Sequence, residues 1–311
     1  MPGFLTHYIA GQALLRVIEP QAQKIIAPFE RMYNVGTQGP DIFFYYMPGH
    51  FRKRTRGLGA LMHQKDLGLF LAEMATLAKD SPAKERDIIF AYTAGFIAHY
   101  ALDVSAHPYV YAMTHNNNAP KIKNSASHRR FETAIDVAML NLLSGQKPAD
   151  YNQWELLAAE AAHMCAASSA ASHVLRSVYG RNIPSKIVHR AMRHMMHLTR
   201  LLQSRKGRRK KWMELAENLT IREPLFSCMV HPQDIDEFDY LNTQKKPWHS
   251  PWEADAQAHN DSFAERYHAA IEEGAKMIRH MYSYVYEGAA LEALATELGN
   301  RSLKTGMECA S

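Results

Sequence analysis

The stretch His99-Tyr100-Ala101-Leu102-Asp103-Val104-Ser105-Ala106-His107 sets three side chains that can ligate a metal in an apolar background. A second stretch, His128-Arg129-Arg130-Phe131-Glu132, adds two more. Each residue of an α-helix advances by about 100°, so residues four apart lie on one face. Imidazole and carboxylate groups buried in an apolar core are costly unless something compensates them. Because a metal ion can compensate all these groups together, the two stretches predict core helices that carry a metal site.

Length and composition favour one large helical core. The chain has 311 residues, of which 47% are hydrophobic, and this length is close to the upper limit for a single core. The clear alternation of apolar and polar residues that would indicate strands is absent, as are sequence repeats. We therefore expect an all-α, single-domain helical bundle over residues 1–311, in which a ligand-bearing half (1–140) is completed by a second helical half (141–311).

Capping residues and apolar spacing place the expected helices. Thr6 is a candidate N-cap for a helix that reaches Glu19, and Ser127 can cap the helix of the second stretch. The helix of the first stretch should begin near Ala83 and end at His107, because Pro108 disfavours helical geometry in the residue before it. Further helices are expected over residues 67–78, 154–178, 184–204, 212–219, 251–286 and 289–298.

Two long segments are expected to lack regular structure. Residues 34–60 contain Gly39-Pro40-Asp41, and residues 222–252 contain several prolines. Clusters of proline and glycine interrupt helices, and loops of this length in a compact domain usually serve a function. Both segments are therefore candidates for the walls of a site.

Charge and targeting signals restrict the partners and the compartment. The net charge is +5, and much of it lies in residues 205–211, Arg-Lys-Gly-Arg-Arg-Lys-Lys. This run is either a solvated connection between helices or a contact with phosphate, that of a nucleic acid or of an anionic membrane surface. The three cysteines have no CxxC spacing and indicate neither a disulfide framework nor a thiolate zinc site. Residues 1–7 lack the regions of a signal peptide, and the apolar run 88–102 is short for a membrane span, so we expect a cytoplasmic protein.

Three further candidate ligands precede the two stretches. His7 lies beside an expected helix start, Asp41 follows a Gly-Pro pair, and His63 precedes a helix. Taken singly, these residues would also suit a helix start, a turn and a surface position. The two stretches are different, because a chance coincidence of two ligand pairs at helical spacing with His107 is improbable.

Taken together, the candidate ligands resemble the pattern of the zinc-dependent phospholipase C family, which shares its all-α fold with fungal single-strand-specific nucleases. The family pattern is a Thr-His near the N-terminus, an Asp, a His, His-x3-Asp, His-Pro and His-x3-Glu. The matching residues are Thr6-His7, Asp41, His63, His99-x3-Asp103, His107-Pro108 and His128-x3-Glu132. The resemblance covers about residues 1–140 and implies the family's helical bundle.

The resemblance also implies how zinc would be shared among these residues. One zinc ion would be held by Asp41, His63, His99 and Asp103, and a second by His107, His128 and Glu132. A third would be held by His7 and a bridging Asp103. In secreted members an N-terminal tryptophan, exposed by removal of a signal peptide, completes this third site. Because this chain starts Met1-Pro2-Gly3, we expect two zinc ions and leave the third open.

The reaction that the resemblance implies is hydrolysis of a phosphodiester by zinc-activated water, with Asp41 accepting the proton of the water. Glu132 favours a phospholipid substrate, because the nuclease branch has an aspartate at that place. Phe43, Phe44 and Tyr45 are candidates for substrate binding. With Tyr46, they would cage a quaternary ammonium head group, stack on a base, or fill the core.

Several functions stay open at this stage. The main expectation is a zinc phosphodiesterase that acts on a phospholipid or another phosphodiester, without a stable complex with nucleic acid. The alternatives are a single-strand nuclease, a phosphodiesterase for small soluble molecules, and a non-catalytic bundle in which the metal serves only folding.

Overall fold

Twelve α-helices surround one long central helix, α6, in the part of the chain that the computed structural model describes. This part comprises residues 3–46, 51–115, 125–203, 208–220, 227–232, 234–253 and 258–309. The helices are α1 (Phe4–Val17), α2 (Pro20–Ile26), α3 (Glu30–Gly36), α4 (Arg52–Met62), α5 (Leu67–Asp80), α6 (Ala83–His115), α7 (Ser125–Ser144), α8 (Gln153–Leu156), α9 (Ala161–Tyr179), α10 (Ser185–Leu202), α11 (Arg208–Thr220), α12 (Phe263–Tyr286) and α13 (Leu291–Leu298). Four 3-10 turns are η1 (Ala27–Phe29), η2 (Gly39–Phe43), η3 (Pro148–Asp150) and η4 (Ser227–Met229).

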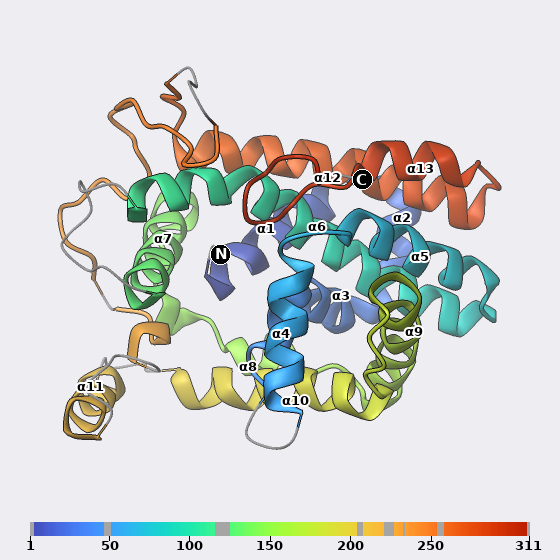
Figure 1. Cartoon of the computed structure of the whole chain (residues 1–311), viewed down its shortest axis with the longest axis horizontal. Coiled ribbons are helices and arrows are strands. Elements are labelled where there is room, and N and C mark those ends of the chain that lie inside the picture. Colours follow the sequence, from blue (N-terminus) through green and yellow to red (C-terminus); the bar gives the residue numbers. More distant parts are fainter. Residues whose placement is uncertain are drawn as a thin grey trace.

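The fold is all-α, which confirms the predicted fold class. Within the described ranges the only β-type pairings are two isolated bridges, Trp248 with His259 and Arg301 with Glu308. In Figure 1, α6 and α12 run along the long axis of the molecule, α10 lies on the opposite side, and α4, α7 and α9 stand between them. One cluster of buried apolar side chains includes residues of both halves of the chain, from Phe4 to Leu303.

Helix α6 forms the centre of this core. It is long and apolar enough to cross a membrane by length and composition, but nearly all of its apolar window is buried by the rest of the protein. A helix that is apolar all round packs on every side, and α6 packs against α12, α3 and α5. His99, Asp103 and His107 are therefore held among rigid neighbours, with exposed fractions of 0%, 0% and 2%.

The expected end of this helix at His107 is wrong, because α6 continues through Pro108 to His115. A proline inside a helix removes one backbone hydrogen bond and crowds the carbonyl group four residues earlier. Here tertiary contacts compensate for the loss. Arg266 of α12 donates to the carbonyl oxygen of Ser105 at 2.7 Å, and Gly306 packs against the carbonyl oxygen of Val104 and the ring of Pro108.

The prediction that residues 34–60 are irregular is also wrong. The segment contains the end of α3, the turn η2 and most of α4. Gly57 and Gly59 disfavour a helix, but packing outweighs this weak preference, because Leu58 and Met62 are buried. Residues 47–50 of the segment lie outside the described residues.

Other boundaries differ from the predicted ones. The helix expected over residues 154–178 is divided into α8 and α9, and the one expected from residue 251 begins at Phe263, where Ser262 and Glu265 form a capping box. Helix α1 begins at Phe4, so Thr6 lies inside the helix and is not its N-cap. Helix α7 begins at Ser125, and the side chain of Ser127 lies outside the described part of the chain, as do residues 204–207 of the basic region.

Two glycines allow α3 and α6 to cross at close range. A Cβ atom on Gly95 would lie 2.0 Å from the carbonyl oxygen of Tyr33, and one on Gly36 would lie 2.2 Å from that of Tyr92. Both distances are far shorter than van der Waals contact, so a side chain at either position would force the helices apart. The crossing also brings the carbonyl oxygen of Thr37 to 3.2 Å from Nδ1 of His99.

Gly95→Ala is expected to lower the free energy of unfolding by about 3 kcal/mol, because overpacking against a backbone cannot be relieved by a change of rotamer. The matched control is Gly57→Ala on α4, where an added Cβ atom meets nothing within 4 Å. That change should stabilise the helix by about 0.5–1 kcal/mol. Urea unfolding of the three proteins measures both effects, and an unchanged midpoint for Gly95→Ala would contradict the close crossing.

Candidate metal centre

Five elements bring the predicted ligands into one buried cluster. Helix α1 supplies His7, the turn η2 supplies Asp41, and His63 lies at the end of α4. The remaining predicted ligands come from α6 and α7, namely His99, Asp103, His107, His128 and Glu132. The i, i+4 spacing holds as predicted, since His99 and Asp103 lie 3.1 Å apart and His128 and Glu132 lie 2.8 Å apart.

Asp103 is the carboxylate around which the imidazoles gather. Its Oδ1 atom lies 3.3 Å from Nε2 of His7, and its Oδ2 atom lies 3.1 Å from Nε2 of His99. Oδ2 is also 3.9 Å from Nε2 of His63 and 3.8 Å from Nδ1 of His107. Asp103 therefore lies among imidazoles of all the predicted zinc sites, and its bridging role stays a prediction.

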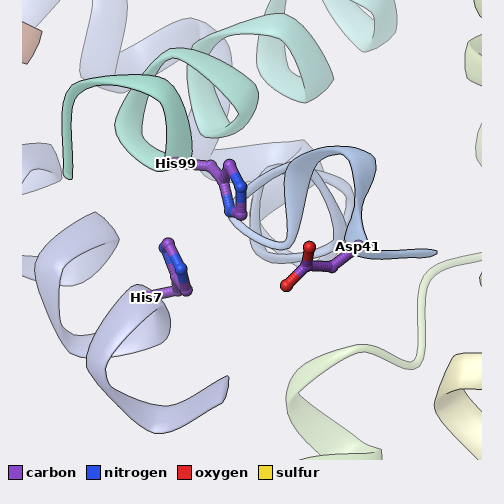
Figure 2. A group of neighbouring side chains, drawn as sticks. All are labelled: His7, Asp41 and His99. Carbon is purple, nitrogen blue, oxygen red and sulfur yellow. The ribbon is translucent and has the colours of Figure 1, made fainter. Parts of the chain in front are cut away.

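The ligand atoms fall into three groups, each of which lies within 4.8 Å and could hold one metal ion. One group is His107, His128 and Glu132, the set predicted for the second zinc. Another is His63, His99 and Asp103, which together with Asp41 was predicted for the first zinc. In the third group, His7 and His99 face Asp41 from two different helices (Figure 2).

The third group differs in part from the predicted third site, because it contains His99 and Asp41 as well as His7. The rings of His7 and His99 are stacked, with centroids 4.1 Å apart. Asp41 also lies close to the first group, with Oδ1 at 3.3 Å from Nε2 of His63. His99 is thus shared by two of the groups, and the group of His107, His128 and Glu132 lies beside them, with Nδ1 of His107 3.8 Å from Oδ2 of Asp103.

Backbone carbonyl groups orient three of the histidines. Nδ1 of His63 lies 2.7 Å from the carbonyl oxygen of Gly59, and Nδ1 of His99 bonds that of Thr37. Nδ1 of His107 bonds the carbonyl oxygen of Leu303. A hydrogen bond at Nδ1 fixes the ring and the tautomer, so that Nε2 is the atom available to a metal.

The atoms that point into the cluster are those that a metal ion would satisfy. Both nitrogens of His7, Nε2 of His99 and Nε2 of His107 are buried without a hydrogen-bond partner among the described residues. The same holds for both oxygens of Asp103 and for Oδ1 of Asp41. Buried polar groups are rarely left unpaired in proteins, so the donor set fits zinc, which prefers imidazole nitrogen and carboxylate oxygen when thiolates are absent.

The electrostatics favour the metal-binding protonation states of Asp103, His7 and His107, but not that of His99. Burial alone would lower the pKa of His99, but the charges of Asp103 and Asp41 outweigh burial and raise it. Burial alone would raise the pKa of Asp103, but the imidazoles of His107, His99 and His7 outweigh it and hold this pKa well below its ordinary value. Burial lowers the pKa of His7 and, more strongly, that of His107. At neutral pH the carboxylate is therefore charged and these two imidazoles are neutral, as metal ligation requires.

Asp136, which is not among the predicted site residues, anchors the helix that carries His7. This fully buried carboxylate accepts hydrogen bonds from the backbone N–H groups of Leu5 and Thr6, at 3.1 and 2.8 Å, and from the Thr6 hydroxyl at 2.5 Å. Nε2 of His231 lies 2.6 Å from its other side. Its position could have been inferred from helical spacing, because Asp136 lies four residues after Glu132 and so on the same face of α7.

The aromatic residues after Asp41 occupy different environments. Phe43 is 2% exposed and packs in the core, whereas the ring of Phe44 lies 5.4 Å from that of His63. Tyr45 is half-buried, and Tyr46 is buried, with its ring 5.2 Å from that of His194. Phe44 thus contacts a predicted ligand, and the binding role of Phe43, Phe44 and Tyr45 stays a prediction.

A helical bundle that gathers imidazoles and carboxylates in its core defines a metal-binding protein of the all-α class. The family model described as zinc-dependent phospholipase C matches residues 6–196, and the chain belongs to this family. Neither the curated proteins nor the solved structures give a significant match. Family membership and the ligand groups together support a zinc-dependent hydrolase of the phospholipase C type.

Proposed function

We propose that the protein hydrolyses the phosphodiester of a phospholipid head group, releasing diacylglycerol and the phosphorylated head group. The observation that carries this proposal is that three ligand groups lie together in the core, with Asp103 close to His7, His99 and His107. A phosphodiester is negatively charged and repels hydroxide, so its hydrolysis needs positive charge that is concentrated at one place. We propose two zinc ions, one held by the group of His63, His99 and Asp103 and one by the group of His107, His128 and Glu132. The group of His7, Asp41 and His99 is a third position.

Bound zinc would supply Lewis acidity, activation of water and neutralisation of the phosphoryl charge. The side chains of the protein would position the substrate and accept the proton of the attacking water. Asp41 is the proposed proton acceptor, because its Oδ1 atom is unpartnered among the described residues and lies 3.3 Å from Nε2 of His63. In the net reaction water adds to phosphorus, the bond between phosphorus and the glycerol oxygen breaks, and that oxygen takes up a proton.

Two further expectations go with this proposal. The protein acts in the cytoplasm, and its basic region contributes a peripheral contact with anionic membrane. Helix α11 begins at Arg208 within that region, and Arg209 and Lys211 on it are exposed. Exposed cations on one helix end suit a surface contact with anionic lipid.

The direct test is release of phosphorylated head group from phosphatidylcholine and phosphatidylglycerol vesicles by zinc-loaded protein, with single-stranded DNA assayed in parallel. We expect zinc-dependent release from lipid and intact DNA. Cut DNA with intact lipid would replace the proposal with a nuclease. If neither is cleaved, hydrolysis of soluble glycerophosphodiesters would indicate a small-molecule phosphodiesterase, and no hydrolysis of any substrate would leave a metal-stabilised bundle.

A further inference from the structure

The segment 300–309 lies outside the residues that the family model matches, yet it is bound to the metal centre. The carbonyl oxygen of Leu303 accepts a hydrogen bond from Nδ1 of His107, and the N–H of Lys304 donates to the carbonyl oxygen of His63 at 3.1 Å. The hydroxyl of Ser302 donates to the same oxygen, also at 3.1 Å. In Figure 1 the segment is the dark red loop beside α6. The backbone of Lys304 is thus fixed relative to two predicted ligands.

The segment is also held together internally. Arg301 and Glu308 form an antiparallel bridge, and the N–H of Asn300 donates to Oε2 of Glu308 at 3.0 Å. The N–H of Arg301 donates to the hydroxyl of Tyr100 on α6 at 2.8 Å. Lys304 therefore belongs to a folded loop, and the backbone position from which its side chain extends is fixed.

The Lys304 side chain lies on an aromatic wall next to the second predicted zinc site. Its Nζ atom is 5.7 Å from the ring centroids of both Tyr111 and Trp252, within the range of a cation–π contact. The ring of Tyr111 in turn lies 4.6 Å from the ring of His128 and 5.7 Å from that of His107. One aromatic ring therefore separates the ammonium group from two predicted ligands.

The charge of Lys304 is not neutralised by a neighbouring acid. No carboxylate of the described residues forms an ion pair with it. Cations also gather on the side of the centre formed by α4 and α7, where burial and the charges of Arg52 and Arg129 lower the pKa of Arg56. Arg129 also acts electrostatically on Tyr45, together with Asp41. Positive charge thus borders the cluster on two sides.

We propose that Lys304 is a specificity-determining residue that selects phosphodiesters whose head group carries no cation over those with a choline head group. The inference rests on the proposed function. The faces of Tyr111 and Trp252, which would suit a quaternary ammonium group, already hold the ammonium group of this chain. A choline group there would meet a like charge, whereas a neutral head group would leave Lys304 free to attract the phosphate.

Mixed vesicles of equal parts phosphatidylglycerol and phosphatidylcholine provide the test, because both lipids then share one surface charge. The two phosphorylated products, glycerol phosphate and phosphocholine, are quantified from the same reaction. We expect wild-type protein to favour phosphatidylglycerol by about fivefold, the size of one like-charge contact in water at about 4 Å. Lys304→Met should bring the ratio close to one, and Lys304→Arg should keep it. The matched control is Lys186→Met on α10, an exposed lysine far along the chain.

A second measurement makes the inference independent of lipid turnover. Calorimetry of zinc-loaded protein with the two products should show tighter binding of glycerol phosphate than of phosphocholine, and Lys304→Met should remove the difference. If neither lipid is cleaved, the proposed function fails and this binding ratio alone decides the role of Lys304. A wild-type preference for choline, or a ratio that Lys304→Met leaves unchanged, would overturn the inference.

Discussion

Asp103→Asn is expected to lower kcat/KM for phosphodiester hydrolysis by more than about 100-fold, since loss of even an outer partner of a metal ligand costs 10–100-fold. The carboxylate lies between Nε2 of His7 and Nε2 of His99, at 3.3 and 3.1 Å. An amide presents one neutral oxygen where two charged ones were available for bridging. Zinc content by elemental analysis should fall together with activity, because Asp103 belongs to the ligand group of His63 and His99 and lies close to His7 and His107.

The control for this variant is Asp80→Asn at the exposed end of α5, which makes the same chemical change far from the cluster. It should keep both zinc content and activity. Far-ultraviolet circular dichroism would show that Asp103→Asn remains helical. Full zinc content and full activity in Asp103→Asn would remove Asp103 from the site.

Removal of zinc by a chelator is expected to abolish hydrolysis and to lower the melting temperature by about 5–10 °C. Each zinc ion at 100 times its dissociation constant stabilises a folded protein by about 2.7 kcal/mol, so the two proposed ions contribute about 5 kcal/mol. An unfolding entropy of about 2.1 cal/mol/K per residue makes each kcal/mol worth about 1.5 °C in a chain of 311 residues. The physical reason is that the buried Nε2 atoms of His99 and His107 and the oxygens of Asp103 lose their partner. Differential scanning fluorimetry before and after chelation measures the shift.

Restoration distinguishes zinc from a general effect of the chelator. Zinc added back should recover both Tm and activity, whereas magnesium, which prefers an octahedron of oxygen ligands, should not. In Asp103→Asn the zinc-dependent shift in Tm should be much smaller than in wild type. An identical Tm with and without zinc in the wild-type protein would show that the cluster does not bind the ion.

The parts of the site that could be predicted from sequence are those fixed by local geometry. His99, Asp103 and His107 follow one another at four-residue steps on one helix, as do His128 and Glu132, and their contacts have the predicted form. Helical spacing alone predicts such neighbours, because no other part of the chain needs to be known. Grouping of these residues with His7, Asp41 and His63 needed the family resemblance in addition.

The parts that could not be predicted depend on contacts between distant segments. Pro108 would normally end a helix, and α6 passes through it because Arg266 of α12 and Gly306 pack against the freed backbone. Neither residue has a local pattern that points to Pro108. The hydrogen bonds of Asp136 to Leu5 and Thr6 are likewise long-range, and the spacing of α7 hinted only that Asp136 faces the same side as Glu132.

The basic character of the surroundings was missed for a different reason. The residues Arg52, Lys53, Arg54 and Arg56 were visible in the sequence, but they lay in a segment expected to be irregular. Only their placement on α4, whose C-terminal end is followed by His63, brings this charge near the cluster. The position of these charges depends on the helix that carries them. Gly57 and Gly59 disfavour a helix, so α4 was not predicted.

The bonds between residues 302–304 and the histidines have a consequence for biosynthesis. Every predicted ligand has been synthesised once the chain reaches Glu132, but the carbonyl oxygen of Leu303 that orients His107 is added much later. A nascent chain therefore exposes imidazoles and carboxylates that can take up metal before their geometry is fixed. The hydrogen bonds to His107 and His63 are therefore complete only after residues 302–304 have been added and folded back onto α6.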